Sequence, residues 1–297
     1  MPATIAANDP GKLLRGGEFY SRVESKLHTD DVLLSELRQP CSRSVPRHEH
    51  ELAYVTVVLQ GHYLEGDHGK MDQLRPFTAV FNPAGVTHAT VIGPEGASFF
   101  TVELRERQLR ELGIRLPSRT TFDHGAGAVL WPGLRLYSSF KRQTADPLVL
   151  ESHLMEMLGA LSRLSWSAAT HERTPPPWFS RIKELLHQEF RNNLRMRDLA
   201  IEAGVHPVHL ARVFRRMEKQ TPGDYLQRLR VQAACQLLMD REYPVALIAG
   251  ECGFSDQSHL TRIFKRFTHT TPARFRRIAT SSPDSKALRL ESKTRSA

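Results

Sequence analysis

The chain has 297 residues, enough for about two domains with hydrophobic cores of their own. Its 40% hydrophobic and 25% charged residues are typical of soluble globular proteins and exclude collagen-like and largely disordered chains. The longest nearly apolar run, residues 52–59, is far shorter than the ~20 residues that span a bilayer. Asn8, Asp9 and Pro10 stand where a signal peptide needs an apolar stretch, so we expect a cytoplasmic protein without a membrane partner.

Positive charge is concentrated in the C-terminal third. Residues 178–280 carry 18 Lys and Arg against 10 Asp and Glu, whereas residues 1–177 carry 19 against 20. This division indicates a neutral module joined to one that contacts a polyanion, most simply nucleic acid. Charge alone is equally compatible with a basic soluble domain.

Residues 31–104 have the pattern of short β-strands. Four segments rich in Val, Phe, Thr and Leu are separated by turns that contain Gly, Asn and Pro. They are Val32–Leu34, Ala53–Leu59, Thr78–Phe81 and Ser98–Leu104. Strands at this spacing predict a sandwich or a small barrel.

The cysteines do not predict a metal site or a disulfide framework. Cys41, Cys235 and Cys252 are an odd number and are widely scattered. We expect buried, reduced thiols.

A helical pattern follows from Pro147 to Trp166. Apolar residues recur at three- and four-residue steps: Leu150, Leu154, Met157, Leu158, Leu161 and Leu164. This helix either caps the barrel or pairs with another subunit, and the pattern favours the first. Ser165–Pro177 lacks periodicity and ends in three prolines, so we expect a linker there. The polar residues 281–297 are expected to be disordered.

The C-terminal third contains an internal repeat. His209–Arg216 matches His259–Arg266 at an offset of 50, and Thr221–Pro222 matches Thr271–Pro272. Each copy has the pattern of a helix, a turn that contains Gly, and a second helix. This is the layout of a helix-turn-helix.

The second helix of each copy is amphipathic. Its apolar stripe is Leu210, Val213, Phe214 and Met217 in the first copy, and Leu260, Ile263, Phe264 and Phe267 in the second. The opposite faces are predicted to read DNA bases, and a solvated charged face is the alternative for each. The candidate DNA-binding residues are Val208, His209, Ala211, Arg212, Arg215, Gln257, Ser258, His259, Thr261, Arg262 and Lys265. A helix from Pro222 to about Met239, roughly 25 Å long, is expected to hold the two reading helices about one turn of DNA apart.

Residues 178–277 resemble the DNA-binding domain of the AraC/XylS family of transcriptional regulators. The resemblance is carried by Gly253–Leu260, Arg262–Arg266 and Thr271–Pro272. It implies a homodimer that forms through the helix near Leu150–Leu164, with RNA polymerase as a further partner. Lys219 and His269 depart from the family pattern, which has Gly there. A left-handed backbone conformation or a different helix end is expected at these two positions.

The N-terminal part contains a histidine cluster. His48-Glu49-His50, Gly61 and Pro83–His88 resemble the two motifs of a cupin barrel, but Tyr54 stands where that family has a metal-binding Glu. On a strand, His48, His50 and Tyr54 share one face. Three alternatives stay open: His48, His50 and His88 hold a divalent metal such as zinc, they line a small-molecule pocket together with Tyr54, or they are structural.

The sequence therefore predicts an α+β protein. Its expected parts are a cupin-like β-barrel sensor domain (1–145), a helical dimerisation region and linker (146–177), a double helix-turn-helix domain (178–280) and a basic tail (281–297). The predicted function is a sequence-specific, non-enzymatic regulator that binds double-stranded DNA and senses a small-molecule or metal effector. One alternative is a metal-dependent cupin enzyme with an appended DNA-binding module, which Tyr54 argues against. Another is a barrel that serves only in dimerisation. The effector, the operator and the direction of regulation are left open.

Overall fold

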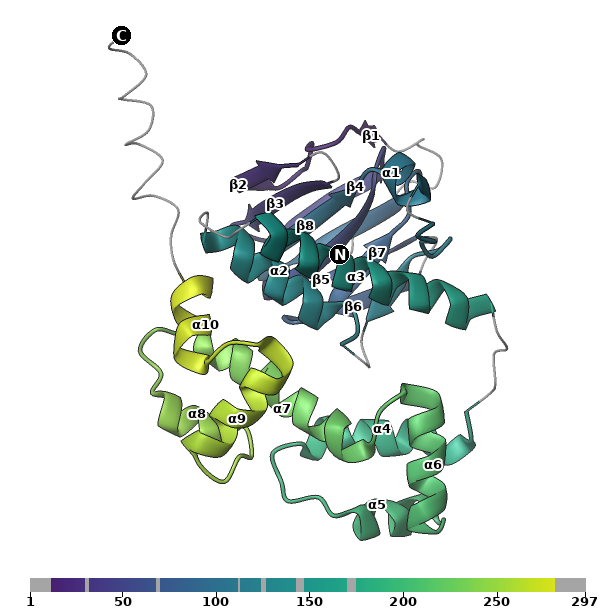
Figure 1. Ribbon diagram of the computed structural model, residues 1–297, viewed down its shortest axis with the longest axis vertical. Helices are drawn as coiled ribbons and strands as arrows, with labels where there is room; N and C mark the ends of the chain where they lie inside the picture. Colours follow the sequence, from purple (N-terminus) through teal and green to yellow (C-terminus); the bar gives the residue numbers. More distant parts are fainter. Residues whose placement is uncertain are drawn as a thin grey trace.

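The computed structural model describes residues 12–29, 32–67, 70–111, 113–123, 127–142, 147–169 and 175–280. Its strands are β1 (Lys12–Leu14), β2 (Arg22–His28), β3 (Val32–Gln39), β4 (Arg43–His50), β5 (Ala53–Asp67), β6 (Lys70–Leu74), β7 (Ala79–Asn82), β8 (His88–Leu104) and β9 (Thr121–Asp123). Its helices are α1 (Glu106–Glu111), α2 (Leu130–Arg142), α3 (Pro147–Ala169), α4 (Pro177–Glu189), α5 (Met196–Ala203), α6 (Pro207–Glu218), α7 (Pro222–Leu238), α8 (Val245–Glu251), α9 (Gln257–Thr268) and α10 (Pro272–Ala279). The predicted α+β class is confirmed (Figure 1).

The strands of the described residues form one sheet that curls around β5 and β8. The order along its main path is β1-β4-β8-β5-β7-β9, with β2 on β3 and β6 on β5. The first part of β8 pairs with β4 and its last part with β3, while β5 accompanies both parts. The sheet therefore bends along these two long strands and encloses a cavity.

Helices α2 and α3 cover one face of this sheet (Figure 1). Leu150, Leu154, Met157, Leu158 and Leu161 of α3 are buried in the core cluster that also contains α2. The predicted apolar stripe of α3 thus packs within its own chain. The helix also runs on to Ala169, three residues past the expected end at Trp166, because Ser and Ala tolerate a helix well without further apolar contacts.

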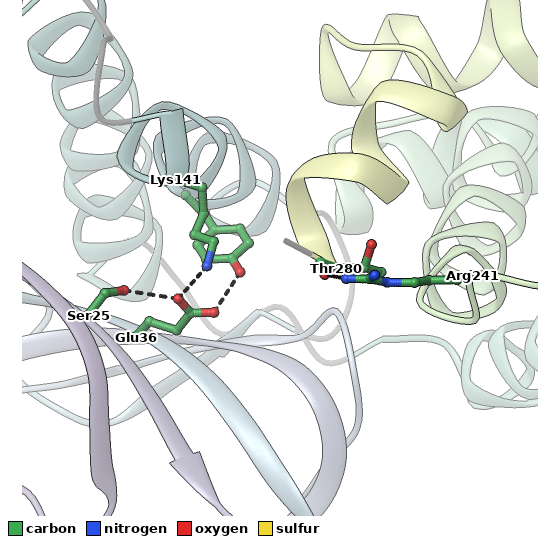
Figure 2. Close-up of polar contacts among 6 residues, drawn as sticks. Ser25, Glu36, Lys141, Arg241 and Thr280 are labelled. Carbon is green, nitrogen blue, oxygen red and sulfur yellow. Dashed lines mark hydrogen bonds and ion pairs between the residues drawn. The ribbon is translucent and has the colours of Figure 1, made fainter. Parts of the chain in front are cut away.

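Helix α2 is fixed to the sheet at both of its ends. At its start, the Asp123 carboxylate of β9 accepts hydrogen bonds from the amides of Gly127, Val129 and Leu130 at 2.8–3.1 Å. Near its end, Lys141 lies 2.8 Å from the carboxylate of Glu36 on β3, which also accepts from Tyr137 (Figure 2). A carboxylate at a helix start satisfies amides that have no partner within the helix.

The C-terminal helices form the two predicted helix-turn-helix units. The first unit contains α5 and α6, the second contains α8 and α9, and α7 joins them (Figure 1). The N-cap of α9 is Asp256, whose side chain accepts from His259 N at 2.7 Å. Lys219 and His269 close α6 and α9 in the left-handed conformation, with φ of 57° and 54°. The first of the two expected helix endings is therefore observed.

The two units have different hydrophobic cores. Phe179, Leu186, Leu199 and the α6 stripe form a cluster of their own with the start of α7. The core of the second unit instead continues into the cluster of α2, α3 and the sheet. Phe275 packs on Phe77 with ring centroids 5.9 Å apart. The second unit is thus joined to the N-terminal part of the chain.

The cysteine prediction is confirmed at two positions and wrong at the third. Cys235 and Cys252 are free and buried, but Cys41 is exposed because it lies in the turn between β3 and β4. No helix in the described ranges is long and apolar enough to cross a membrane.

A fragment of residues 177–280 tests the unequal cores. Without the N-terminal part, α9 and α10 lose the contacts of Phe267 with Trp131 and of Phe275 with Phe77. We expect amide hydrogen exchange in α9 to become at least about tenfold faster than in α6, whereas the full chain protects both helices. Equal exchange of α6 and α9 in the fragment contradicts the shared core.

Candidate nucleic-acid interface and cavity

The predicted reading faces of α6 and α9 point to solvent. On α6, Val208, His209, Arg212 and Arg215 are exposed and Ala211 is half-buried. Most of these residues, with Arg216, line a hollow along the helix surface. On α9, the exposed residues are Gln257, Ser258, Arg262 and Lys265, with Thr261 half-buried.

Burial of the opposite stripes fixes the direction of these faces. Leu210, Val213 and Phe214 are buried on α6, as are Leu260, Ile263 and Phe264 on α9. Because side chains at three- and four-residue steps share one side of a helix, the arginines must lie on the other side. Both faces therefore present guanidinium groups to whatever polyanion approaches.

Two residues of α9 have partners within the chain. The His259 ring is half-buried, with Nδ1 3.1 Å from Ser255 Oγ and the ring packed edge-on against Phe254. It holds the turn that precedes α9, which sets it apart from its exposed neighbours. Arg266 forms an ion pair with Asp224 on α7. The neighbouring helix is thus the partner of Arg266, one of the two partners that its position allows.

The three histidines of the N-terminal part meet in the cavity of the sheet. His48, His50 and His88 are buried, and each offers a ring nitrogen within 4.8 Å of the others. The cavity measures about 70 Å³, and Tyr54, Thr56, Tyr63 and Glu65 are among its walls. Since one water needs ~10–15 Å³ on this scale, the space accepts a few waters, an ion or a very small molecule.

Two hydrogen bonds to backbone carbonyls set the protons on the histidine rings. His48 Nδ1 lies 2.8 Å from Pro46 O, and His88 Nδ1 lies 3.3 Å from Val86 O. These nitrogens donate, so the lone pair of each ring is on Nε2. His50 Nδ1 is buried without a hydrogen-bond partner among the described residues.

Burial keeps two of these imidazoles neutral. It lowers the pKa of His48 to about 4 and that of His50 to about 3, and the neighbouring His88 adds to both shifts. A neutral imidazole is the form that binds a metal ion. The cluster therefore needs no deprotonation to act as a ligand set at neutral pH.

Tyr54 connects the cluster to a buried amide. Its hydroxyl lies 3.0 Å from His88 Nε2 and accepts from Asn82 Nδ2 at 3.0 Å. Asn82 is fully buried, and it also donates to Glu65 Oε1 at 2.8 Å and accepts from Thr120 Oγ1 at 2.8 Å. Burial raises the pKa of Tyr54 well above its usual range, so the hydroxyl keeps its proton for His88.

Sequence periodicity missed Tyr63 and Glu65 as cavity residues. Tyr54 and Thr56 occupy even positions of β5, and simple alternation would place residues 63 and 65 on the opposite face. The pairing of β5 with β8 shifts register on both sides of Gly61, which has φ of 70°. A bulge therefore turns the odd positions into the cavity, and Gly61 is the only signal of it in the sequence.

Comparison with known proteins places relatives over the C-terminal part. A family described as a helix-turn-helix domain matches residues 199–278. The probable transcription factor PqrA of Proteus vulgaris is 35% identical over 100 residues, which are 33% of this chain and 82% of that protein. The bifunctional transcriptional activator/DNA repair enzyme AdaA of Bacillus subtilis is 31% identical over 111 residues, 37% of this chain and 53% of that one. Among solved structures, ToxT from Vibrio cholerae is 10% identical over 85% of this chain and 100% of that chain, with a TM-score of 0.37.

Replacing Asn82 by Ala tests the network beside the cavity. The change leaves Tyr54, Glu65 and Thr120 each without one partner, so we expect the free energy of unfolding to fall by about 2–4 kcal/mol. Thr120→Val removes a single hydrogen bond and is the matched control, with an expected loss of about 1 kcal/mol. Denaturant unfolding measures both variants. Equal losses contradict a central role of Asn82.

Proposed function

The chain belongs to the AraC/XylS family of transcriptional regulators, and we propose that it binds double-stranded DNA through α6 and α9 under the control of an effector held in the cavity of its N-terminal sheet. The observation that carries this proposal is the pair of repeated helices with exposed, arginine-bearing faces in the basic third of the chain. The major groove of B-DNA is wide enough to admit such a helix.

Arg212 and Arg262 are the proposed base readers. Each follows the N-terminal turn of its helix, is exposed, and has the two-pronged donor geometry that matches the O6 and N7 acceptors of guanine. Arg216 and Arg266 stand one turn later. The ion pair of Arg266 with Asp224 supports a structural role for that residue.

A divalent metal such as zinc is the effector that the cavity fits best. His48, His50 and His88 would supply three nitrogen ligands, a set that zinc accepts with one position open. Hydrogen bonds of ligand histidines to backbone carbonyls are the usual support of such sites. The 70 Å³ volume also supports this choice, because drug-sized ligands need about 300–1,000 Å³. A very small polar molecule is the second candidate for the same volume.

We propose that the cavity senses and does not catalyse. A metal-dependent enzyme needs room for its substrate beside the ion, and a few water volumes do not provide it. The proposed setting is the cytoplasm, with the chain acting as a homodimer beside RNA polymerase. Leu148, Val149 and Met155 on α3 stay exposed in one chain and support α3 as the contact between subunits.

A chain of contacts supports transmission from the cavity to the DNA-binding helices. A ligand on His88 Nε2 competes with Tyr54 for the same lone pair, and Tyr54 is linked to Asn82 and Thr120. Thr120 precedes β9, whose Asp123 holds the start of α2. Further along α2, Arg135 donates to Phe267 O at the end of α9 at 3.0 Å. An effector shifts DNA binding only by its different affinity for the two states.

Zinc titration tests the histidine cluster. After chelation and dialysis, we expect the full-length protein to bind one equivalent of zinc and to be stabilised by about 3 kcal/mol at one hundred times its Kd. His48→Ala, His50→Ala and His88→Ala should each abolish this gain in thermal unfolding. His62→Ala is the control, since this histidine lies outside the cavity. If zinc does not bind and a triple His→Ala variant keeps its DNA response, the cluster is structural.

Arginine substitutions separate base reading from general attraction. Arg262→Ala should cost about 1–3 kcal/mol on the operator and flatten the preference at one base pair. Arg266→Ala, which removes an ion pair to α7, should change operator and random DNA alike. Binding is titrated on both DNAs at several salt concentrations. Proportional losses on the two DNAs with Arg262→Ala would show that Arg262 does not read a base.

A further inference from the structure

Helix α7 docks on the N-terminal part of the chain. Gln232 Nε2 donates to Phe77 O at 2.9 Å, and Gln236 Nε2 donates to Pro76 O at 3.4 Å. One turn before Gln232, Arg228 lies against Gly127, where an added Cβ would come within 3.1 Å of Arg228 Cδ. We call this set of contacts the docking interface. It joins the helix between the two DNA-binding units to the loop that starts α2.

Arg228 is buried in the docking interface without a hydrogen-bond partner. It is 0% exposed, and in the described part of the chain none of its three guanidinium nitrogens has an acceptor. The face of the Tyr225 ring lies 4.4 Å from the guanidinium carbon. Asp123 is the nearby carboxylate, but three amides at the start of α2 already occupy its oxygens. Trp131 Nε1, beside Gly127, is a second buried donor without an acceptor.

An unpaired buried guanidinium opposes docking. Burial lowers the pKa of Arg228, yet an arginine stays charged at any physiological pH. Removing such a charge from water is costly unless hydrogen bonds replace its hydration, and stacking on a tyrosine returns only part of that cost. Separation of α7 from the Gly127 loop would return water to the guanidinium.

Arg230 shows what a satisfied arginine on the same helix looks like. It is 7% exposed, and its guanidinium donates to Phe190 O at 2.7 Å and to Asn192 O at 2.9 Å. These carbonyls belong to the end of α4 and the turn after it, within the DNA-binding part. Arg230 thus supports the helix packing, and its partners are absent at Arg228.

We propose that Arg228 makes the docking interface a release point, where the cost of its unpaired charge keeps docked and undocked arrangements close in free energy. Apolar packing, the two glutamine bonds and the Arg135 bond to Phe267 O favour the docked arrangement, and hydration of Arg228 favours the undocked one. A ligand of modest differential affinity can then shift the population. Only this last step rests on the proposed effector site.

The test is Arg228→Met in the full-length protein, with Arg230→Met as matched control. Methionine keeps much of the apolar length and removes the charge. We expect Arg228→Met to raise Tm by several degrees and to slow amide exchange in residues 76–78 and 228–236 at least about tenfold. Arg230→Met, which removes two satisfied hydrogen bonds, should lower Tm.

Two further results complete the test. Gln232→Ala removes a docking bond and should accelerate exchange at residues 76–78 without changing exchange in α5 and α6. An Arg228→Met protein that unfolds, melts lower than wild type or exchanges at the wild-type rate overturns the proposal. Because neither DNA nor an effector is present, these outcomes leave the proposed DNA-binding function untouched.

Discussion

Three backbone amides at the start of α2 converge on the carboxylate of Asp123, and the arrangement of the remaining layers depends on this contact. It fixes α2 to the last strand of the sheet. Helix α2 then forms the middle layer, with the sheet on one side and α9 and α10 on the other (Figure 1). Glu36 holds its far end, so α2 cannot slide along the sheet without breaking buried polar contacts.

The polar interior of the sheet has a definite purpose in this frame. Fully satisfied buried networks specify one arrangement of a core, although they contribute little net stability. Asn82 uses its amide to hold Tyr54 and Glu65 in place, and Tyr54 in turn orients on His88. The histidines therefore face a rigid wall on one side and a small space on the other. A ligand in that space acts on a network that has few alternative arrangements.

Local patterns in the sequence predicted the elements well, and contacts between distant segments were beyond them. The repeat and the apolar stripes identified α6 and α9, because helix faces follow directly from spacing. The convergence of His48, His50 and His88 followed from strand alternation and motif resemblance. The bulge at Gly61 hid Glu65, since one extra residue reverses every later side chain. The burial of Arg228 depends on which surface α7 meets, and no local pattern contains that information.

The continuous core between the sheet and the second unit has a consequence for synthesis. Chains emerge from the ribosome N-terminus first, and their domains generally fold as units in that order. The sheet, α2 and α3 are therefore in place when α8, α9 and α10 appear, and they act as a template on which Phe267 and Phe275 find their contacts. The first unit emerges earlier and assembles around its own apolar residues. The nascent chain thus completes its two DNA-binding halves by different routes, one autonomous and one templated.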